Sequence, residues 1–293
     1  MNDAAEEAKA PQEVWETLSQ DQRDRAYNNN RAVRNSPELV RRRDALSAEW
    51  RADHSAALDI PYGPKSRQAF DLYPAADPGA PCLVFIHGGY WQKNSREAFA
   101  VYAEGAAAIG WSVAMPSHTL APDATLSEIV AEIGDALDWL SREGPQHGIA
   151  GPIVLSGWSA GGHLVAMALN HSAVTAGLAI SGVYELAPIR DTFLNAALNL
   201  TDQEIATLSP LRLPVVQKPL AIAYGEAEVP ALVRDSRALH ALRAEAGAPG
   251  ALIPIPGGDH FTILDELRSA EGALVRAAQD VLALALDLKK SAA

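Results

Sequence analysis

Cysteine is almost absent from this chain, because Cys82 is the only one among 293 residues. A single cysteine excludes an internal disulfide framework and a cysteine-based metal site. Chains without disulfides are typical of a reducing compartment, so we expect the protein to be cytoplasmic. The amino-terminal stretch 1–10 is acidic and has no apolar core, which argues against a secretory signal.

Long apolar runs and an excess of basic charge are also missing. No run approaches the roughly 20 apolar residues that span a bilayer, so we expect no membrane insertion. The chain has 24 Lys and Arg against 36 Asp and Glu, a formal net charge of −12, which disfavours nucleic acid and anionic membranes as partners. The one basic cluster, Arg41–Arg43, is interpreted as a solvated helix face because Asp44 and Glu49 follow it.

Motifs of cofactor and metal sites are not found either. There is no Walker sequence, no G-x-G-x-x-G after a predicted strand and no H-E-x-x-H. We therefore expect no cofactor and no metal. The remaining composition, 48% apolar and 20% charged, is typical of a globular protein.

From about residue 57 onward, strand-like and helix-like runs alternate, which predicts an α/β fold with a mostly parallel, doubly wound sheet and helices on both faces. Two runs that alternate like half-buried strands, Leu58–Pro61 and Ala69–Pro74, predict an antiparallel edge. Later strands are expected at Cys82–Ile86, Trp111–Met115, Ile153–Ser156, Gly177–Ser181, Leu220–Tyr224 and Ala251–Ile255, and helices at Ser95–Ile109, Thr125–Arg142, Ala160–Asn170, Pro230–Glu245 and Glu271–Leu288. Short helical pieces between 181 and 220 should lie above the carboxyl edge of the sheet.

The sequence before this domain differs in character. Residues 1–56 are predicted to form an N-terminal helical extension, and residues 57–293 a catalytic domain. Apolar residues recur at helical spacing in two groups, Val14–Leu18 and Val40–Trp50, on either side of an Asn-rich turn at Tyr27–Asn30. Such a helical pair could pack over the main domain as a lid.

The central motif is Gly157-Trp158-Ser159-Ala160-Gly161, a G-x-S-x-G sequence between a predicted strand and a predicted helix. In a nucleophile elbow of this kind, the serine hydroxyl projects at the carboxyl edge of the sheet from a strained backbone that only small neighbours tolerate. Ser159 is therefore the candidate nucleophile. It needs a base, an acid that orients the base, and donors for an oxyanion.

The base should follow both the serine and the acid along the chain. Of the eight histidines, four precede Ser159, and His163 and His171 lie on or just after the elbow helix, where packing or capping is the simpler role. His240 falls within a predicted helix. His260 follows the last predicted strand and is the candidate base. Its neighbour Asp259 is interpreted as a turn residue, because a side chain adjacent in sequence reaches the imidazole poorly.

The acid is expected in the loop Gly225–Pro230, which follows a predicted strand and contains two glutamates. Glu228, just before a helix, is the better placed, and Glu226 remains the alternative. The oxyanion donors are expected from the residue after the nucleophile and from the loop after an early strand. That loop is the glycine-containing sequence 87–91, so the candidates are Gly88, Gly89, Tyr90 and Ala160.

Several motifs together resemble the arylformamidase (kynurenine formamidase) branch of the α/β-hydrolase superfamily, a neighbour of the hormone-sensitive-lipase-like esterases. They are His87–Gln92, Thr119–Pro122, Ser156–Leu164, Ser181–Tyr184 and Asp259–Phe261, with Tyr27-Asn28 and Asp59–Gly63 as further similarities. The resemblance covers nearly the whole chain. The HGGYW sequence is fairly specific to this branch, whereas G-x-S-x-G is common to the superfamily.

The resemblance implies a metal-free hydrolase that removes the formyl group of an N-formyl arylamine, such as N-formylkynurenine, through an acyl-enzyme. Ser159, His260 and Glu228 would be its nucleophile, base and acid. The family usually has Asp at the acid position and more often His at the position of Trp158. One alternative is a carboxylesterase for small acyl esters with the same triad, and another is a non-catalytic ligand-binding homologue.

The substrate is expected to be a small aromatic amide or ester. A formamide has only a hydrogen on its acyl side, so the arylamine side should need flat apolar walls. We expect some of the aromatic residues in the motif loops to contact it, namely from the set Tyr90, Trp91, Trp158, Tyr184 and Phe261. The oligomeric state stays open, with a homodimer among the alternatives.

Overall fold

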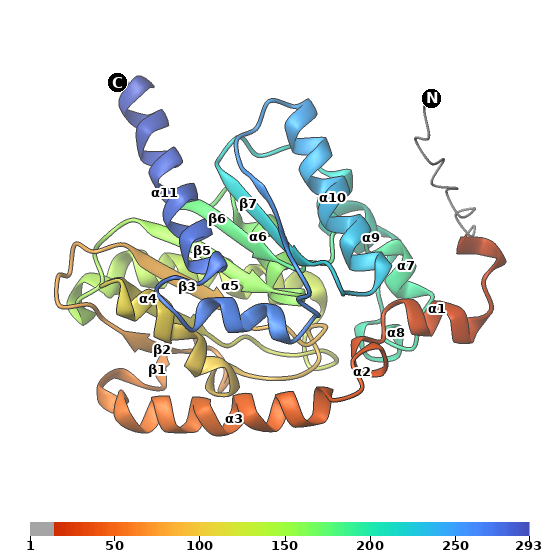
Figure 1. The fold of residues 1–293 in the computed structure, drawn as a ribbon, viewed down its shortest axis with the longest axis horizontal. Coiled ribbons are helices and arrows are strands. Elements are labelled where there is room, and N and C mark those ends of the chain that lie inside the picture. Colours follow the sequence, from red (N-terminus) through yellow and green to blue (C-terminus); the bar gives the residue numbers. More distant parts are fainter. Residues whose placement is uncertain (1–14, 293) are drawn as a thin grey trace, which may run out of the picture.

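The structure is a computed structural model that describes residues 15–292 (Figure 1). The acidic stretch 1–10 and Val14, on which two of the sequence predictions depend, lie outside the described residues. None of the helices within the described range is long and apolar enough to cross a membrane.

An eight-stranded sheet crosses the centre of the described chain, in the order β1-β2-β4-β3-β5-β6-β7-β8. The first pairings, β1 with β2 and β2 with β4, are antiparallel, and the others are parallel. The strands are β1 (Ile60–Pro61), β2 (Ala69–Tyr73), β3 (Cys82–Ile86), β4 (Ser112–Pro116), β5 (Ile153–Trp158), β6 (Val174–Ile180), β7 (Leu220–Gly225) and β8 (Leu252–Ile255). The predicted α/β class and its antiparallel edge are confirmed.

Strand β2 departs from the predicted half-buried pattern, because all five of its residues are buried. The buried set includes Asp71, whose carboxylate accepts hydrogen bonds from Arg51 Nε at 2.7 Å and Arg96 Nε at 3.0 Å. Two guanidinium groups thus compensate a charge that would otherwise be costly to bury. Alternation in the sequence could not show that helices would cover the second face as well.

Helices cover both faces of the sheet and form an apolar core on each (Figure 1). One face carries α5 (Leu126–Glu143), α6 (Ala160–Ala168) and α10 (Pro230–Glu245), and the other carries η3 (Arg96–Ala103), α4 (Glu104–Ala108) and α11 (Ala273–Ala292). Helix α5 begins at a capping box in which Thr125 and Glu128 bond each other's backbone N–H groups. The predicted helix Ser95–Ile109 is divided into the 3₁₀ segment η3 and the short α4.

The chain before β1 is helical, as predicted, but contains more pieces than two. They are η1 (Trp15–Thr17), α1 (Gln20–Ala26), α2 (Asn29–Ala32), the long α3 (Ser36–Asp53) and η2 (Ser55–Ala57). Asn29 and Asn30, expected in a turn, instead begin α2, because the Asn28 side chain accepts a hydrogen bond from the Arg31 N–H at 3.0 Å and caps this helix.

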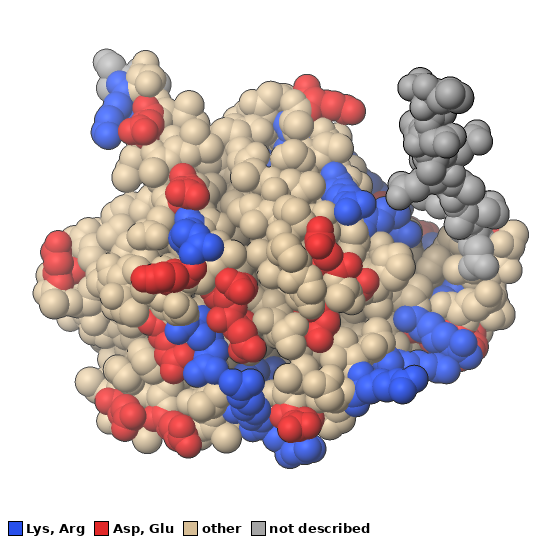
Figure 2. Space-filling view, in the orientation of Figure 1, with Lys and Arg blue, Asp and Glu red and all other residues tan. Residues whose placement is uncertain are grey.

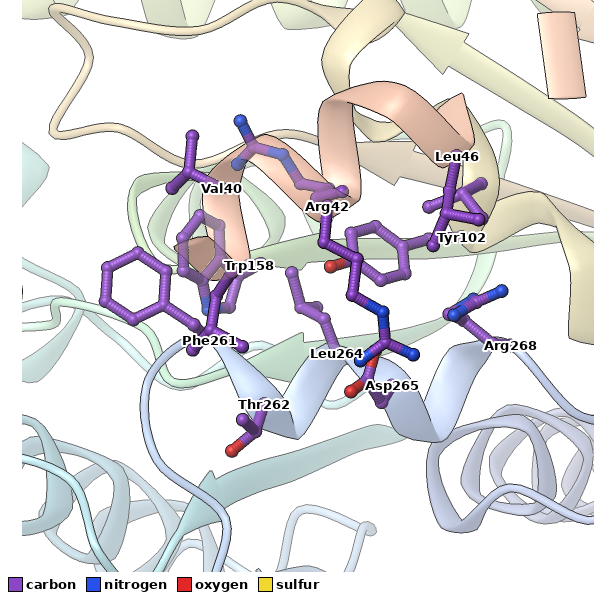
Figure 3. Close-up of a pocket in the computed structure, with 13 residues that line it drawn as sticks. Val40, Arg42, Leu46, Tyr102, Trp158, Phe261, Thr262, Leu264, Asp265 and Arg268 are labelled. Atoms are coloured by element: carbon purple, nitrogen blue, oxygen red, sulfur yellow. The ribbon is translucent and has the colours of Figure 1, made fainter. Parts of the chain in front are cut away.

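The basic cluster on α3 is only partly the solvated face that was predicted. Arg41 and Arg42 are exposed, and Arg42 extends toward Asp265 of η6 (Thr262–Leu267) across a small pocket (Figure 3). Arg43 is buried, and its guanidinium lies 4.1 Å from the centre of the Phe99 ring. Acidic and basic side chains are interspersed on the face shown in Figure 2, so the cluster forms no continuous basic surface there.

The segment between β6 and β7 consists of short helices, as predicted. They are α7 (Ala187–Arg190), α8 (Asn195–Leu198), α9 (Asp202–Leu208) and η5 (Pro210–Arg212). Hydrogen bonds join this segment to the N-terminal helices: the Trp15 indole donates to Asp191 Oδ2 at 2.9 Å, and the Phe193 N–H donates to Asp24 Oδ1 at 2.8 Å. The two regions therefore meet above the carboxyl edge of the sheet.

Candidate active site

Ser159 lies directly after β5, in the strained backbone conformation of a nucleophile elbow, with φ +57° and ψ −117°. The flanking glycines make this turn possible. A Cβ on Gly157 would lie 2.5 Å from the carbonyl oxygen of Gly161, and one on Gly161 would lie 2.1 Å from that of Ile86. Any larger residue at either position would displace the elbow from the sheet.

His260 and Glu228 lie beside this serine in a continuous chain of hydrogen bonds. The imidazole Nε2 is 3.1 Å from Ser159 Oγ, and Nδ1 is 3.0 Å from Glu228 Oε2. An ionised carboxylate can only accept, so Nδ1 carries the proton, and Nε2 accepts the hydrogen bond from the serine hydroxyl. The structure thus brings together Ser159, His260 and Glu228, which are the candidate nucleophile, the candidate base and the better placed of the two candidate acids.

The two glutamates of the loop after β7 are in different environments. The Glu228 side chain is fully buried, and its Oε1 accepts hydrogen bonds from the Gly225 N–H at 3.0 Å and from the Ser181 hydroxyl. Glu226 is exposed at the surface. Asp259 accepts the N–H groups of the two residues that follow His260 at 2.8 and 2.9 Å, which agrees with its interpretation as a turn residue.

Ser181 is a residue of this site that the sequence reasoning did not select. It follows β6, which lies between the elbow strand β5 and the acid-bearing β7, and its φ is +50°. The signal was its position, because residues just after neighbouring parallel strands meet at one edge of the sheet. Ser181 fixes one oxygen of Glu228 and leaves the other for the imidazole.

The loop after β3 lies against the elbow. A Cβ on Gly88 would lie 2.9 Å from Ser159 Cβ, and one on Gly89, where φ is +122°, would lie 2.6 Å from the Lys93 carbonyl oxygen. Within residues 15–292, the N–H groups of Gly89 and Tyr90 donate to no acceptor. Ala160 is the first residue of α6, where a backbone N–H has no partner within the helix. These N–H groups are free to bind an oxyanion.

A cavity of about 450 Å³ opens beside Ser159. His260, Gly89 and Tyr90 line it from the motif loops. The N-terminal helices add Tyr27–Asn30, Val40 and Arg43, and the segment after β6 adds Phe193 and Leu194. Sequence reasoning missed these last contributions, because they depend on how two distant segments fold back over the sheet.

The five aromatic residues expected near a substrate divide into two groups. Tyr90, Trp158 and Phe261 line the cavity. Trp91 and Tyr184 do not line it, and both are completely covered in the core, with exposures of 1% and 0%. Trp91 packs edge-on against His163, with ring centres 4.9 Å apart, and Tyr184 packs in the same core. The expectation of a substrate contact is therefore wrong for both residues.

Among the described residues, no group of three or more His, Cys, Asp or Glu side chains could hold a metal ion. His163 is buried, and its Nε2 bonds the Leu208 carbonyl oxygen at 2.7 Å, which agrees with the packing role predicted for it.

Known proteins share this architecture. The BD-FAE family model matches residues 70–179, which include the glycine loop and the elbow. Kynurenine formamidase of Danio rerio is 23% identical over 275 residues, covering 86% of this chain and 93% of that protein. A crystal structure of a protein from Silicibacter sp. TM1040, provisionally assigned as a thioesterase, is 30% identical with a TM-score of 0.76 and covers 87% of this chain and 98% of its own.

The chain belongs to the α/β-hydrolase superfamily, and within it the chain is similar to the kynurenine formamidases. This α/β-hydrolase is a serine hydrolase, near the hormone-sensitive-lipase-like esterases. Among its esterase relatives, one from Fusarium pseudograminearum is 33% identical over 129 residues, covering 40% of each chain.

Proposed function

We propose that this hydrolase removes the formyl group from an N-formyl arylamine through an acyl-enzyme on Ser159. The observation that carries the proposal is the hydrogen-bonded chain Ser159–His260–Glu228, with distances of 3.1 and 3.0 Å, at the edge of a cavity. A serine hydroxyl is a weak nucleophile until a base accepts its proton, and this arrangement supplies both the base and the acid that orients it.

The reaction begins when Ser159 Oγ attacks the formyl carbon and its proton moves to His260 Nε2. The resulting oxyanion accepts hydrogen bonds from the N–H groups of Gly89, Tyr90 and Ala160. His260 then donates its proton to the amine nitrogen, the C–N bond breaks, and the arylamine leaves. Water attacks the formyl-enzyme with His260 as base, which releases formate and restores Ser159. Glu228 holds the imidazole in the required tautomer throughout.

The shape of the site supports a small acyl group and a flat leaving group. Gly88 lies close to both Trp158 and Ser159, which leaves little space on that side of the nucleophile. Tyr90 and Phe261 provide aromatic walls on the cavity side. The relatives named kynurenine formamidase, which match most of this chain, favour a formamide among the small acyl compounds.

A carboxylesterase is the second candidate, and the relatives named esterase support it. The same three residues would then cleave an ester of a small acid. The chemistry is shared up to the leaving group, which would be an alcohol instead of an amine.

The test compares formate release from N-formylkynurenine with hydrolysis of p-nitrophenyl acetate by the wild-type protein and Ser159→Ala. Formate release that the variant lacks supports the proposal. Ester turnover without any formamide turnover supports the carboxylesterase instead. A protein on which a fluorophosphonate forms no adduct at Ser159 has no activated serine, and both proposals would be wrong.

A further inference from the structure

Trp158, the residue before the nucleophile, contacts the loop that carries His260. It is the last residue of β5 and is 4% exposed. Its indole Nε1–H donates to the backbone carbonyl oxygen of His260 at 2.8 Å. Its ring centre lies 4.6 Å from that of the imidazole, with 34° between the planes. One rigid side chain next to Ser159 therefore contacts both the backbone and the ring of His260.

The indole itself is held from several sides. Phe99 packs against it with ring centres 5.6 Å apart, and a Cβ on Gly88 would lie 2.6 Å from the ring. Figure 3 shows Phe261 beside Trp158, at the end of the pocket under α3. Because β5 lies in the middle of the sheet, Trp158 has a fixed support and little freedom to move.

The loop of His260 depends on this contact. His260 lies between β8 and η6, and its side chain is almost completely buried. No backbone N–H within residues 15–292 donates to its carbonyl oxygen, so the indole supplies the hydrogen bond that this buried group needs. Without the donor the carbonyl would be buried and unpaired, which favours a shift of the loop.

We propose that Trp158 is a positioning residue for the general base, and that it acts on the reaction through His260. The proposal rests on the function proposed above for Ser159 and His260. Trp158 then fixes the base relative to the nucleophile, because it is bonded to the His260 backbone and directly precedes Ser159 in the chain. A shift of about 1 Å in a catalytic group can slow a reaction roughly 100-fold, so this anchor should affect kcat.

Trp158→Phe tests the proposal, because it keeps an aromatic ring and removes the N–H donor. We expect kcat to fall by about 10- to 100-fold and KM to stay within about threefold. The rate at which a fluorophosphonate modifies Ser159 should fall by a similar factor, and this measurement needs no knowledge of the substrate. The low-field proton resonance of His260 Nδ1–H should weaken or disappear from the NMR spectrum of the variant.

Trp139→Phe is the matched control. Trp139 lies on α5 and packs on Phe70 and His147, with ring centres 5.5 Å apart in both pairs, on the face of the sheet opposite to Phe99. We expect its kcat, KM, phosphonylation rate and NMR resonance to match the wild type. A loss of activity through general loosening of the core would appear in both variants.

Different results would overturn the two proposals. If Trp158→Phe raises KM and leaves kcat and phosphonylation unchanged, Trp158 is a substrate contact and the positioning proposal is wrong. If the wild-type protein itself is not phosphonylated, the proposed function is wrong. Should Trp158→Phe fail to fold, β-(3-benzothienyl)alanine at position 158 keeps the bicyclic shape and replaces N–H by sulfur, and the same kinetic comparison decides.

Discussion

Two glutamates stand two positions apart in the loop after β7, yet only Glu228 faces the imidazole. Glu228→Gln should lower kcat by on the order of 10,000-fold, because an amide can donate to Nδ1 and so favour the wrong tautomer of His260. Glu226→Gln is the matched control and should keep wild-type kinetics, since Glu226 is exposed. Initial rates with a saturating substrate measure both. A larger loss in the Glu226 variant would show that the acid is misassigned.

Gly89 permits a second comparison between single residues. Gly89→Ala would place a Cβ 2.6 Å from the Lys93 carbonyl oxygen at a φ of +122°, so the loop must shift and carry its N–H groups away from the oxyanion. Losing such donors costs about 100- to 1,000-fold in kcat. Gly134→Ala, in the middle of α5 with open space around it, should stay active and gain roughly 0.5–1 kcal/mol in stability. Equal activity of the two variants would contradict this role of the loop.

At the scale of elements, the local sequence pattern predicted where several strands and helices begin and end. The apolar run Cys82–Ile86 is a strand over the predicted range, and Pro230–Glu245 is a helix with both predicted ends. It was harder to predict which side chains of an element point into the core. Arg43 and Trp91 point into the core because other elements cover them there, which depends on packing between distant segments.

In the candidate site, too, the sequence predicted some residues, whereas others depend on packing between distant segments. The elbow motif and the chain order were enough to select Ser159 and His260 and to place the acid in the loop after β7, because the order of strands in this fold decides which loops meet. They left Glu226 as the alternative to Glu228. The cavity walls were not predictable in this way. The sequence predicted that the N-terminal helices and the segment after β6 could lie over the sheet, but it could not show that Phe193 and the Asn28–Asn30 stretch would line the cavity.

The contact between the N-terminal helices and the segment after β6 leads to a prediction about access. Asp24→Ala with Asp191→Ala removes the side-chain acceptors for the Phe193 N–H and the Trp15 indole. Two such bonds contribute about 1 kcal/mol each, so we expect local opening to increase by about 10- to 30-fold. Hydrogen exchange of residues 15–33 should rise accordingly. Because Asn28–Asn30 line the cavity, KM should rise about three- to tenfold.

Asp123→Ala is the control for this prediction, because Asp123 is an exposed aspartate without a hydrogen bond or ion pair within the described residues. It should leave exchange and KM unchanged. If the double variant also exchanges at the wild-type rate, the two segments do not hold each other over the cavity, and the N-terminal helices are not a lid.

At the scale of the whole molecule, buried titratable groups determine how stability should respond to acid. Burial lowers the pKa of His118 and His163 to about 4, and it holds the pKa of His87 well below its ordinary value. Such a group stays neutral in the folded chain while it takes up a proton in the unfolded chain. Its contribution is therefore complete above about pH 6.5 and is lost as the pH falls toward the folded pKa.

Asp235 acts in the opposite direction. Burial raises its pKa to about 6, so its contribution is complete below about pH 4 and is lost as the pH rises through 6. A shift of this size corresponds to about 3 kcal/mol, as it does for His118 or His163. Burial also raises the pKa of Asp265. Three histidines therefore oppose two aspartates, and the free energy of unfolding should fall between pH 7 and pH 4.5.

His163→Gln should make that fall smaller by about 2 to 3 kcal/mol, because glutamine keeps an N–H for the Leu208 carbonyl oxygen and does not titrate. Asp235→Asn should make the fall steeper, since it removes one opposing group while its amide oxygen can still accept the Tyr184 and Glu185 N–H groups. Urea unfolding of the three proteins at a series of pH values measures the slopes. Parallel curves for wild type and His163→Gln would mean that this histidine does not remain neutral in the folded molecule, and the acid sensitivity would then have to come from His87 and His118.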